Sequence, residues 1–141
     1  MKVQIRRLNS EFLMEAHNEA GNTIQMDNST AENQQGFSPM QLLLAGIGGC
    51  SMIDILMILK KQRQDVQDIH IHVEGQRVEQ IPKVFEKIIL HYIFFGSVEP
   101  EKAQRAIELS LEKYCSVSKM LEKTAQISYT FEVKNSNNLQ S

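Results

Sequence analysis

The stretch from Ser38 to Gln64 limits what the rest of this chain can fold into. Ser38 and Gln41 flank Pro39 in the pattern of a capping box, and proline is favoured at the first position of a helix. The stretch ends in basic residues, which the negative end of a helix dipole favours. These signals predict one long helix that begins at Ser38.

The middle of this predicted helix is apolar on every face. Between Leu42 and Leu59 the only charged residue is Asp54, and Cys50 lies one turn before it. A helix that is apolar all round has to be buried on all sides. We therefore expect it to form the centre of the structure, with the rest of the fold arranged around it.

A transmembrane span is the alternative interpretation, because spans begin at about 18 apolar residues. Against it, Asp54 would cost about 2.5 to 3.5 kcal/mol near the centre of a bilayer. Residues 1–30 are polar and lack the apolar region of a signal peptide. We expect no membrane association and a cytoplasmic location.

Length and composition exclude fewer functions than the long apolar helix does. The length of 141 residues predicts one domain over residues 1–141, with a polar tail, Asn135 to Ser141, that we expect to fray. A net charge of −2 gives no basic surface for nucleic acid. Two cysteines without an export signal indicate either buried inert thiols or redox chemistry.

The segments around the helix alternate between strand and helix patterns. Expected strands, in chain order, are Val3–Leu8, Phe12–Ala16, Thr23–Asp27, Asp68–Glu74, Val84–Phe95 and Gln126–Val133. The first three form an antiparallel meander, and the next two form a hairpin. A second helix begins near Glu99 and stops at Tyr114, with Tyr114 on its inward face, and a short helix covers Val117–Glu122. This order predicts an α+β fold.

A single chain of this size has too few strands to cover the long helix. About 26 residues at 1.5 Å each give a helix of roughly 39 Å. A homodimer that packs the two long helices together would bury them. We therefore expect a homodimer.

The two thiols are the candidates for chemistry. A reactive cysteine needs an environment that lowers its thiol pKa. Cys115 directly precedes the short helix and has Lys113 and Lys119 nearby, which favours a lowered pKa. Cys50 lacks such neighbours, and Asp54 on the same face would raise its pKa if ionised. From the residues alone, two structural cysteines remain an equal alternative.

Three segments of the chain resemble a known family. They are the run from Ser38 to Cys50 with its Gly-Gly-Cys, the Gly75 to Val84 turn, and Glu108 to Ser118 with Cys115. Together they resemble the OsmC/Ohr family of thiol-dependent hydroperoxide reductases, over roughly Gly21 to Val133. The similarity is greatest to the OsmC-like branch.

The resemblance implies an OsmC-like fold in an intertwined homodimer, with two active sites at the subunit interface. It also implies that Cys50 attacks an organic hydroperoxide and becomes a sulfenic acid, which Cys115 resolves as a disulfide. A dithiol or a small thiol then reduces that disulfide, and no bound cofactor or metal is expected. An apolar pocket lined by residues such as Leu43, Ile47 and Ile53 would favour an apolar peroxide.

The chain departs from the family at the pair that activates the first thiol. The family's glutamate falls on Met40, beside Gln41, which we interpret as a capping residue. Its arginine has no clear equivalent, although Arg6 and Arg7 lie in the first strand. The alternative function is therefore a non-catalytic or weakly active binder of an apolar small molecule in the interface pocket, or a thiol redox sensor.

The histidines are interpreted as structural or solvated. His70 and His72 alternate with apolar residues and could offer two ligands to a metal, but a metal site needs a third. His91 is expected to be a satisfied sheet residue.

Overall fold

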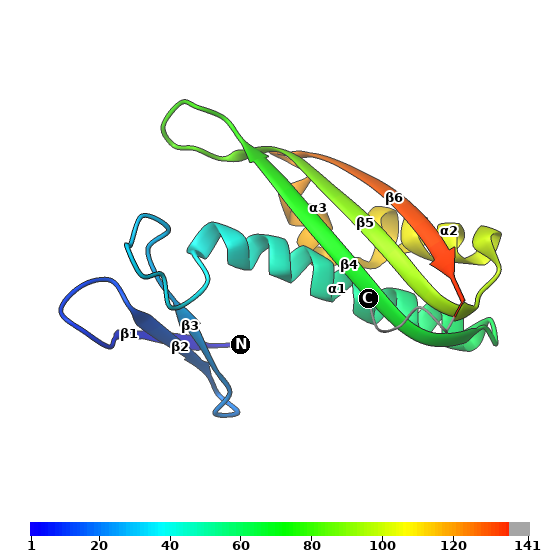
Figure 1. Cartoon of the computed structure of the whole chain (residues 1–141), viewed down its shortest axis with the longest axis horizontal. Helices are drawn as coiled ribbons and strands as arrows, with labels where there is room; N and C mark the ends of the chain where they lie inside the picture. The colour runs from blue at the N-terminus through cyan, green and yellow to red at the C-terminus, as the bar shows by residue number, and fades with distance from the viewer. Residues whose placement is uncertain (136–141) are drawn as a thin grey trace. The chain divides into compact units, whose positions relative to one another are not determined.

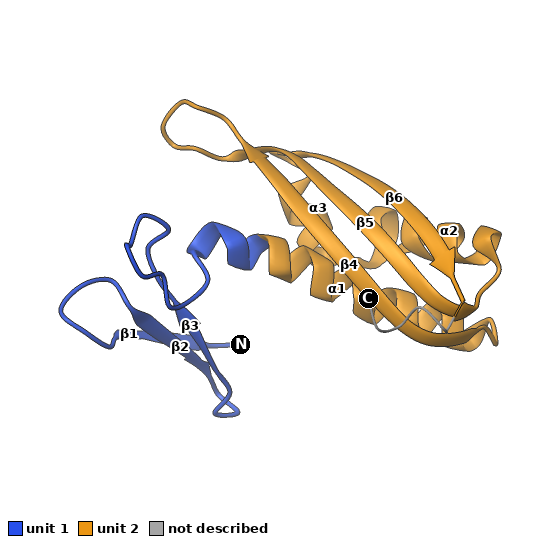
Figure 2. Cartoon of the chain, in the orientation of Figure 1, with its two compact units in different colours: residues 1–43 blue, residues 44–141 orange. Residues whose placement is uncertain are grey.

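A computed structural model describes residues 1–135, so most of the tail from Asn135 onward lies outside the described residues. The chain divides into two compact units, Met1–Leu43 and Leu44–Ser141 (Figure 2). Helix α1 (Pro39–Lys61) runs across the division as one continuous helix. The prediction of a single domain over residues 1–141 stays a prediction.

The first unit contains the expected antiparallel meander. Its strands are β1 (Val3–Arg7), β2 (Met14–Asn18) and β3 (Thr23–Met26), in the order β1-β2-β3. Ile5, Ala16 and Ile24 pair across the three strands on one face. Ile5 and Ile24 are exposed, so this apolar face of the sheet is open to solvent in the single chain.

Helix α1 begins as the sequence predicts. The Ser38 backbone N–H donates to Gln41 Oε1 at 2.9 Å, and the Gln41 N–H donates to Ser38 Oγ at 3.2 Å. These two bonds are the reciprocal pair of a capping box and satisfy two donors at the helix start. The interpretation of Gln41 as a capping residue is confirmed.

The burial of α1 differs from the expectation in the single chain. One stripe is fully buried, including Ile47, Ile55 and Leu59, but Ile53 is 62% exposed and Met57 is 58% exposed. By length and mean hydropathy α1 could cross a membrane, and only 28% of its apolar window is buried within the chain. The expected all-round burial therefore requires something beyond one copy of the chain.

The second unit is built on one sheet of three strands (Figure 1). Strand β5 (Phe85–Ser97) lies in the middle, antiparallel to β4 (Asp65–Arg77) and parallel to β6 (Gln126–Lys134). Ile88, Leu90, Tyr92 and Phe94 of β5 alternate along its buried face. The other face of β5 is only half-buried within one chain.

Helices cover the buried face of this sheet. Helix α2 (Pro100–Leu109) continues directly into a π-helix, η1 (Ser110–Tyr114), and a short helix, α3 (Ser116–Leu121), follows. Tyr129 of β6 donates to Glu108 of α2 at 2.9 Å, while Tyr92 of β5 hydrogen-bonds to Ser51 of α1 at 2.8 Å. The α+β prediction is confirmed, with both long helical segments on one side of the sheet.

Tyr114 corrects one detail of the predicted second helix. Regular helical spacing placed it on the inward face, but its side chain is 50% exposed. The π-helix adds residues to the turn and rotates those that follow it away from α-helical register. Ser110 and Leu111 stay buried, and Tyr114 turns outward.

Replacing the cap residue tests the start of α1. We expect Ser38→Ala to lower the free energy of unfolding by about 1 kcal/mol, because the Gln41 N–H loses its acceptor. Urea unfolding at one fixed protein concentration measures the change. Ser10→Ala, at an exposed position outside any helix, is the control and should change stability by less than about 0.5 kcal/mol. Equal stabilities for the two variants would contradict the capping assignment.

Candidate active site

Cys50, Asp54 and Cys115 converge at one place in the second unit. Their ligand atoms, two sulfurs and a carboxylate oxygen, all lie within 4.8 Å of one another. Cys50 and Asp54 occupy successive turns on the same face of α1. Cys115 lies opposite, at the junction of η1 and α3. The structure thus brings together the two cysteines that the sequence singled out, beside the carboxylate that the sequence had placed on the same helix face as Cys50.

A chain of buried hydroxyl groups holds Asp54. Tyr92 OH lies 2.8 Å from Ser51 Oγ, which lies 3.0 Å from Ser110 Oγ, which lies 3.0 Å from Asp54 Oδ2. Each hydroxyl has one hydrogen and a carboxylate only accepts. Ser110 is the donor to Asp54 and also the donor toward Ser51, so its one hydrogen is shared between them, while either oxygen of the Tyr92–Ser51 pair could donate. Burial raises the pKa of Tyr92 well above its usual range, so its phenol stays protonated.

Cys115 is held in place by backbone contacts on both sides. Its N–H donates to the Ser110 carbonyl at 2.7 Å, and its sulfur accepts from the Ser118 N–H at 3.3 Å. Ser118 Oγ also donates to the Leu111 carbonyl at 3.0 Å. The sequence prediction that Cys115 immediately precedes a short helix is confirmed, with Cys115 itself as the N-cap residue.

The expected lowering of the Cys115 pKa is wrong. Burial raises the pKa of the Cys115 thiol from 9.0 to about 12, although the Ser118 N–H opposes the shift. The nearby lysines do not face the sulfur: Lys113 Nζ lies over the Tyr114 ring at 5.2 Å, and Lys119 pairs with Glu122 at 3.1 Å. Proximity in sequence therefore did not supply the expected positive charge.

A groove of about 330 Å³ begins at Asp54. Asp54, Met57, Ile58, Lys61 and Gln62 line one side along α1, and Leu109 and Tyr114 line the other. Its lining is apolar in the middle, while Lys61 gives it a cationic group about 10 Å along the helix from Asp54. Gln62 Oε1 is buried there without a hydrogen-bond partner among residues 1–135.

The groove is not lined by the residues expected from the sequence. Ile47 is fully buried in the core, and Ile53 is exposed on another face of α1. The helix places residues on the groove side at positions 54, 57, 58 and 61, which continue the stripe that starts at Cys50.

The residues considered as activators of the Cys50 thiol lie in the first unit. Arg6 pairs with Glu15 across β1 and β2 at 3.0 Å. Arg7 pairs in register with Met14. Met40 is half-buried in the first turn of α1, next to the capping residue Gln41. Arg6 therefore has a side-chain partner within the first unit.

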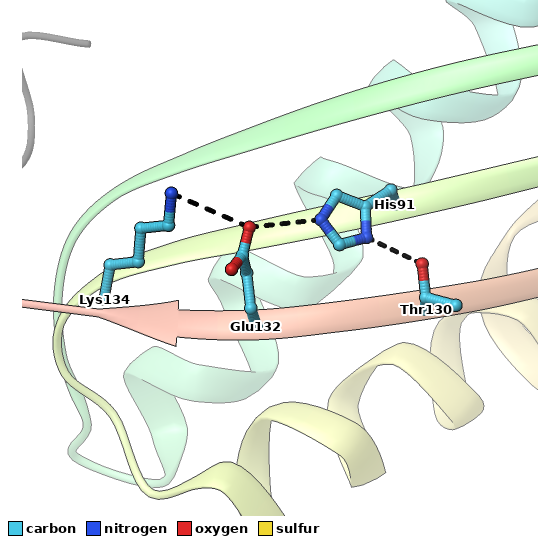
Figure 3. A network of polar contacts seen from close by, with 4 residues as sticks. All are labelled: His91, Thr130, Glu132 and Lys134. Atoms are coloured by element: carbon cyan, nitrogen blue, oxygen red, sulfur yellow. Dashed lines mark hydrogen bonds and ion pairs between the residues drawn. The ribbon is translucent and has the colours of Figure 1, made fainter.

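The strand histidines form a polar outer surface on the face of the sheet away from the helices. His91 Nδ1 lies 2.6 Å from Thr130 Oγ1 and its Nε2 lies 3.3 Å from Glu132, which Lys134 also approaches (Figure 3). The prediction of a satisfied sheet histidine is confirmed. His70 bonds to Asp68 at 3.0 Å rather than joining a ligand set with His72.

Within residues 1–135, the one group of three or more metal-ligating side chains is Cys50, Asp54 and Cys115. Two sulfurs and a carboxylate with an open fourth position resemble the ligands of zinc. Ligation would require both sulfurs as thiolates, a form that a bound metal ion itself favours. The same three groups can also take part in thiol chemistry.

Sequence reasoning missed the supporting residues Ser51, Ser110 and Tyr92. A signal was present, because Asp54 interrupts an apolar helix and Ser110 interrupts the inward face of the second helix. Polar residues on two buried faces have to find partners. That rule points to a pairing between them, but it does not identify Tyr92, whose place depends on the register of β5.

Comparisons with known proteins place these features in a family. The family of OsmC-like proteins matches residues 31–130. Protein YhfA of Escherichia coli is 42% identical over 115 residues, covering 81% of this chain and 84% of its own length.

Solved structures have the same fold. A hypothetical protein from Aquifex aeolicus superimposes with a TM-score of 0.84 at 38% identity, over 95% of this chain and 96% of its own. The organic hydroperoxide resistance protein OhrB of Bacillus subtilis has a TM-score of 0.69 at 19% identity, over 93% and 96% of the two chains. At that identity the second match establishes the fold alone.

Alkylation tests the environment of Cys115. We expect iodoacetamide to modify Cys115 of the reduced, folded protein at least about a hundredfold more slowly than in urea. A rise in pKa from 9.0 to about 12 lowers the thiolate fraction about a thousandfold at neutral pH. Peptide mass spectrometry over time measures the rate. Similar rates in the folded and unfolded protein would contradict a buried, protonated Cys115.

Proposed function

Because the chain belongs to the family of OsmC-like proteins, we propose that it reduces organic hydroperoxides, with Cys50 as the attacking thiol and Cys115 as the resolving thiol. The observation that carries this proposal is the position of the two sulfurs, within 4.8 Å of each other beside an apolar groove. Cys50 is partly exposed and Cys115 is buried. Their accessibility matches an attacking and a resolving role, respectively.

In the first step, the Cys50 thiolate attacks the terminal oxygen of the hydroperoxide. The O–O bond breaks, the alkoxide takes up a proton and leaves as an alcohol, and Cys50 becomes a sulfenic acid. In the second step, Cys115 attacks the Cys50 sulfur and water leaves. The sulfurs have to approach from at most 4.8 Å to about 2.05 Å. Cys115 lies at a junction between two helical segments, where such a shift is accommodated more easily than within a helix.

The groove supports an organic rather than an inorganic peroxide. Met57, Ile58 and Leu109 offer an apolar wall to the organic part of a substrate whose peroxide group lies at Asp54. The Cys50 sulfur lies within 4.8 Å of the Asp54 carboxylate. Hydrogen peroxide would gain nothing from that wall. The oxidised pair is then reduced by an external dithiol or small thiol in two exchange steps, without a bound cofactor.

The proposed active form is a homodimer. An exposed stripe of α1 consists of Ala45, Gly49, Ile53 and Leu56, and it contains no charge. A Cβ on Gly49 would meet nothing within 4 Å, so a second helix has room to approach closely there. Packing α1 against its copy would remove this apolar stripe from water and provide the expected burial. We expect this dimer in the cytoplasm, with no membrane or nucleic-acid partner.

Peroxide consumption tests the proposed reaction. We expect the wild-type protein to reduce cumene hydroperoxide with dithiothreitol or dihydrolipoamide as the donor. Cys50→Ser should lose this activity to background, because it removes the attacking sulfur. Cys115→Ser should still convert one equivalent of peroxide but form no intramolecular disulfide. Peroxide and non-reducing peptide mass measurements follow the two steps.

Equal background rates for wild type and Cys50→Ser would reject the reductase proposal. The groove at Asp54 and the unmatched activating pair would then favour a binder of an apolar small molecule or a thiol redox sensor. Thermal shifts with apolar ligands, and disulfide formation without turnover, distinguish these two alternatives.

A charge in the exposed stripe tests the dimer. We expect Ile53→Glu to shift the protein from dimer to monomer or to reduce its folded yield, because the carboxylate would be buried between two helices. Light scattering after size exclusion measures the mass. Met120→Glu makes a comparable exchange at an exposed residue of α3 and should leave the mass unchanged. A wild-type monomer at micromolar concentration would contradict the proposal.

A further inference from the structure

We propose that Asp54 carries the proton of the resolving step: its carboxylate takes the proton from the Cys115 thiol and gives it to the hydroxide that leaves Cys50. This inference rests on the proposed function. It assigns a role to a carboxylate that is otherwise a costly interruption of an apolar helix. It also identifies a residue of this chain that participates in thiol chemistry where the usual activating acid is absent.

The position of Asp54 suits transfer between the two sulfurs. Its carboxylate oxygen lies within 4.8 Å of both Cys50 Sγ and Cys115 Sγ, which also lie within 4.8 Å of each other. A proton leaving one sulfur and required at the other therefore has one acceptor near both.

The hydroxyl chain leaves part of Asp54 available for this role. Ser110 donates to Oδ2, and no hydrogen bond within residues 1–135 reaches Oδ1. Ser110 and Ser51 are fully buried, so the chain that fixes the carboxylate is shielded from water. A carboxylate with one oxygen anchored and one oxygen unbonded is oriented yet still able to accept a proton.

The resolving step needs such an acceptor. Cys115 is buried and protonated at neutral pH, whereas the nucleophile has to be a thiolate. As Cys115 attacks, the S–S bond forms and the S–O bond of the sulfenic acid breaks. The Cys115 sulfur is oxidised, the Cys50 sulfur is reduced, and the proton that Asp54 has taken joins the leaving hydroxide as water.

Electrostatics alone predicts the opposite effect of removing Asp54. Its negative charge raises the pKa of Cys115, so a neutral replacement would make that thiol more acidic and disulfide formation faster. A proton-transfer role predicts slower disulfide formation instead. The sign of the change therefore distinguishes a participating carboxylate from a merely nearby one.

The titratable groups that surround Asp54 come from three elements. Cys50 and Lys61 lie on α1, Cys115 and Tyr114 lie at the end of η1, and Tyr92 of β5 connects through the hydroxyl chain. Lys61 is two turns away along the helix, and burial raises the pKa of Tyr92 so that it stays a phenol. Among these groups, the carboxylate is the one suited to accept a thiol proton at neutral pH.

Asp54→Asn is the test, because the amide keeps the size and an acceptor for Ser110. The reduced protein is mixed with one equivalent of cumene hydroperoxide and quenched with acid over time. Cumyl alcohol reports the attack by Cys50, and non-reducing mass spectrometry reports the disulfide. We expect alcohol formation at the wild-type rate or faster, disulfide formation about a hundredfold slower, and a sulfenic acid that dimedone traps.

The pH dependence provides a second readout. At pH values where wild-type disulfide formation has reached a plateau, the rate in Asp54→Asn should rise about tenfold per pH unit, since hydroxide has to replace the carboxylate. Ser110→Ala removes the hydrogen bond that positions Asp54 and should give a smaller decrease in the same step. Glu86→Gln changes an exposed carboxylate on β5 and should change neither step.

These measurements distinguish a failure of the proposed function from a failure of the role proposed for Asp54. If the wild-type protein forms no cumyl alcohol, the proposed function fails and this inference fails with it. If the wild type forms both products, disulfide formation in Asp54→Asn at the wild-type rate or faster overturns the role of Asp54 alone. An equal slowing of both steps also overturns it, because it would indicate a general structural effect.

Discussion

The packing of one stripe of α1 against the segment from η1 to α3 determines where the two thiols of this protein lie. Gly46 of α1 leaves room for Val117, whose Cγ1 would lie 3.8 Å from an added Cβ. One and two turns farther along the same stripe, Cys50 and Asp54 meet Cys115 and the hydroxyl of Ser110. Because both sides of the contact are helical, the close approach at Gly46 also fixes the spacing one and two turns farther along. The helix packing therefore places the two thiols beside each other.

The same packing has an electrostatic consequence. It removes Cys115 from water and raises its thiol pKa, which protects the Cys115 sulfur but makes it a poor nucleophile. It also encloses part of Asp54, whose charge needs compensation, and the hydroxyl chain from Tyr92 supplies it. Burial therefore creates a need for proton transfer beside the thiols, and the anchored carboxylate lies where that need arises.

Much of the candidate site was predictable from local signals. The capping box and the apolar run defined α1. The serine-rich segment after Cys115 predicted the short helix α3, of which Cys115 is the N-cap residue. The pKa of Cys115 and the groove were not predictable. Lys113 and Lys119 are near in sequence but turn toward Tyr114 and Glu122, and the lining of a groove depends on which face of α1 the neighbouring helix leaves open.

The sequence by itself determined the elements, their order, the family and the two thiols, because capping, periodicity and motifs are local properties of the chain. Only the tertiary structure decided that Asp54 lies beside both sulfurs and that Tyr92 reaches it through two serines. The hydrogen bonds of that chain of hydroxyls join residues 41 to 59 positions apart. They depend on strand register and on the π-helix turn, neither of which has a local signature strong enough to read from the residues.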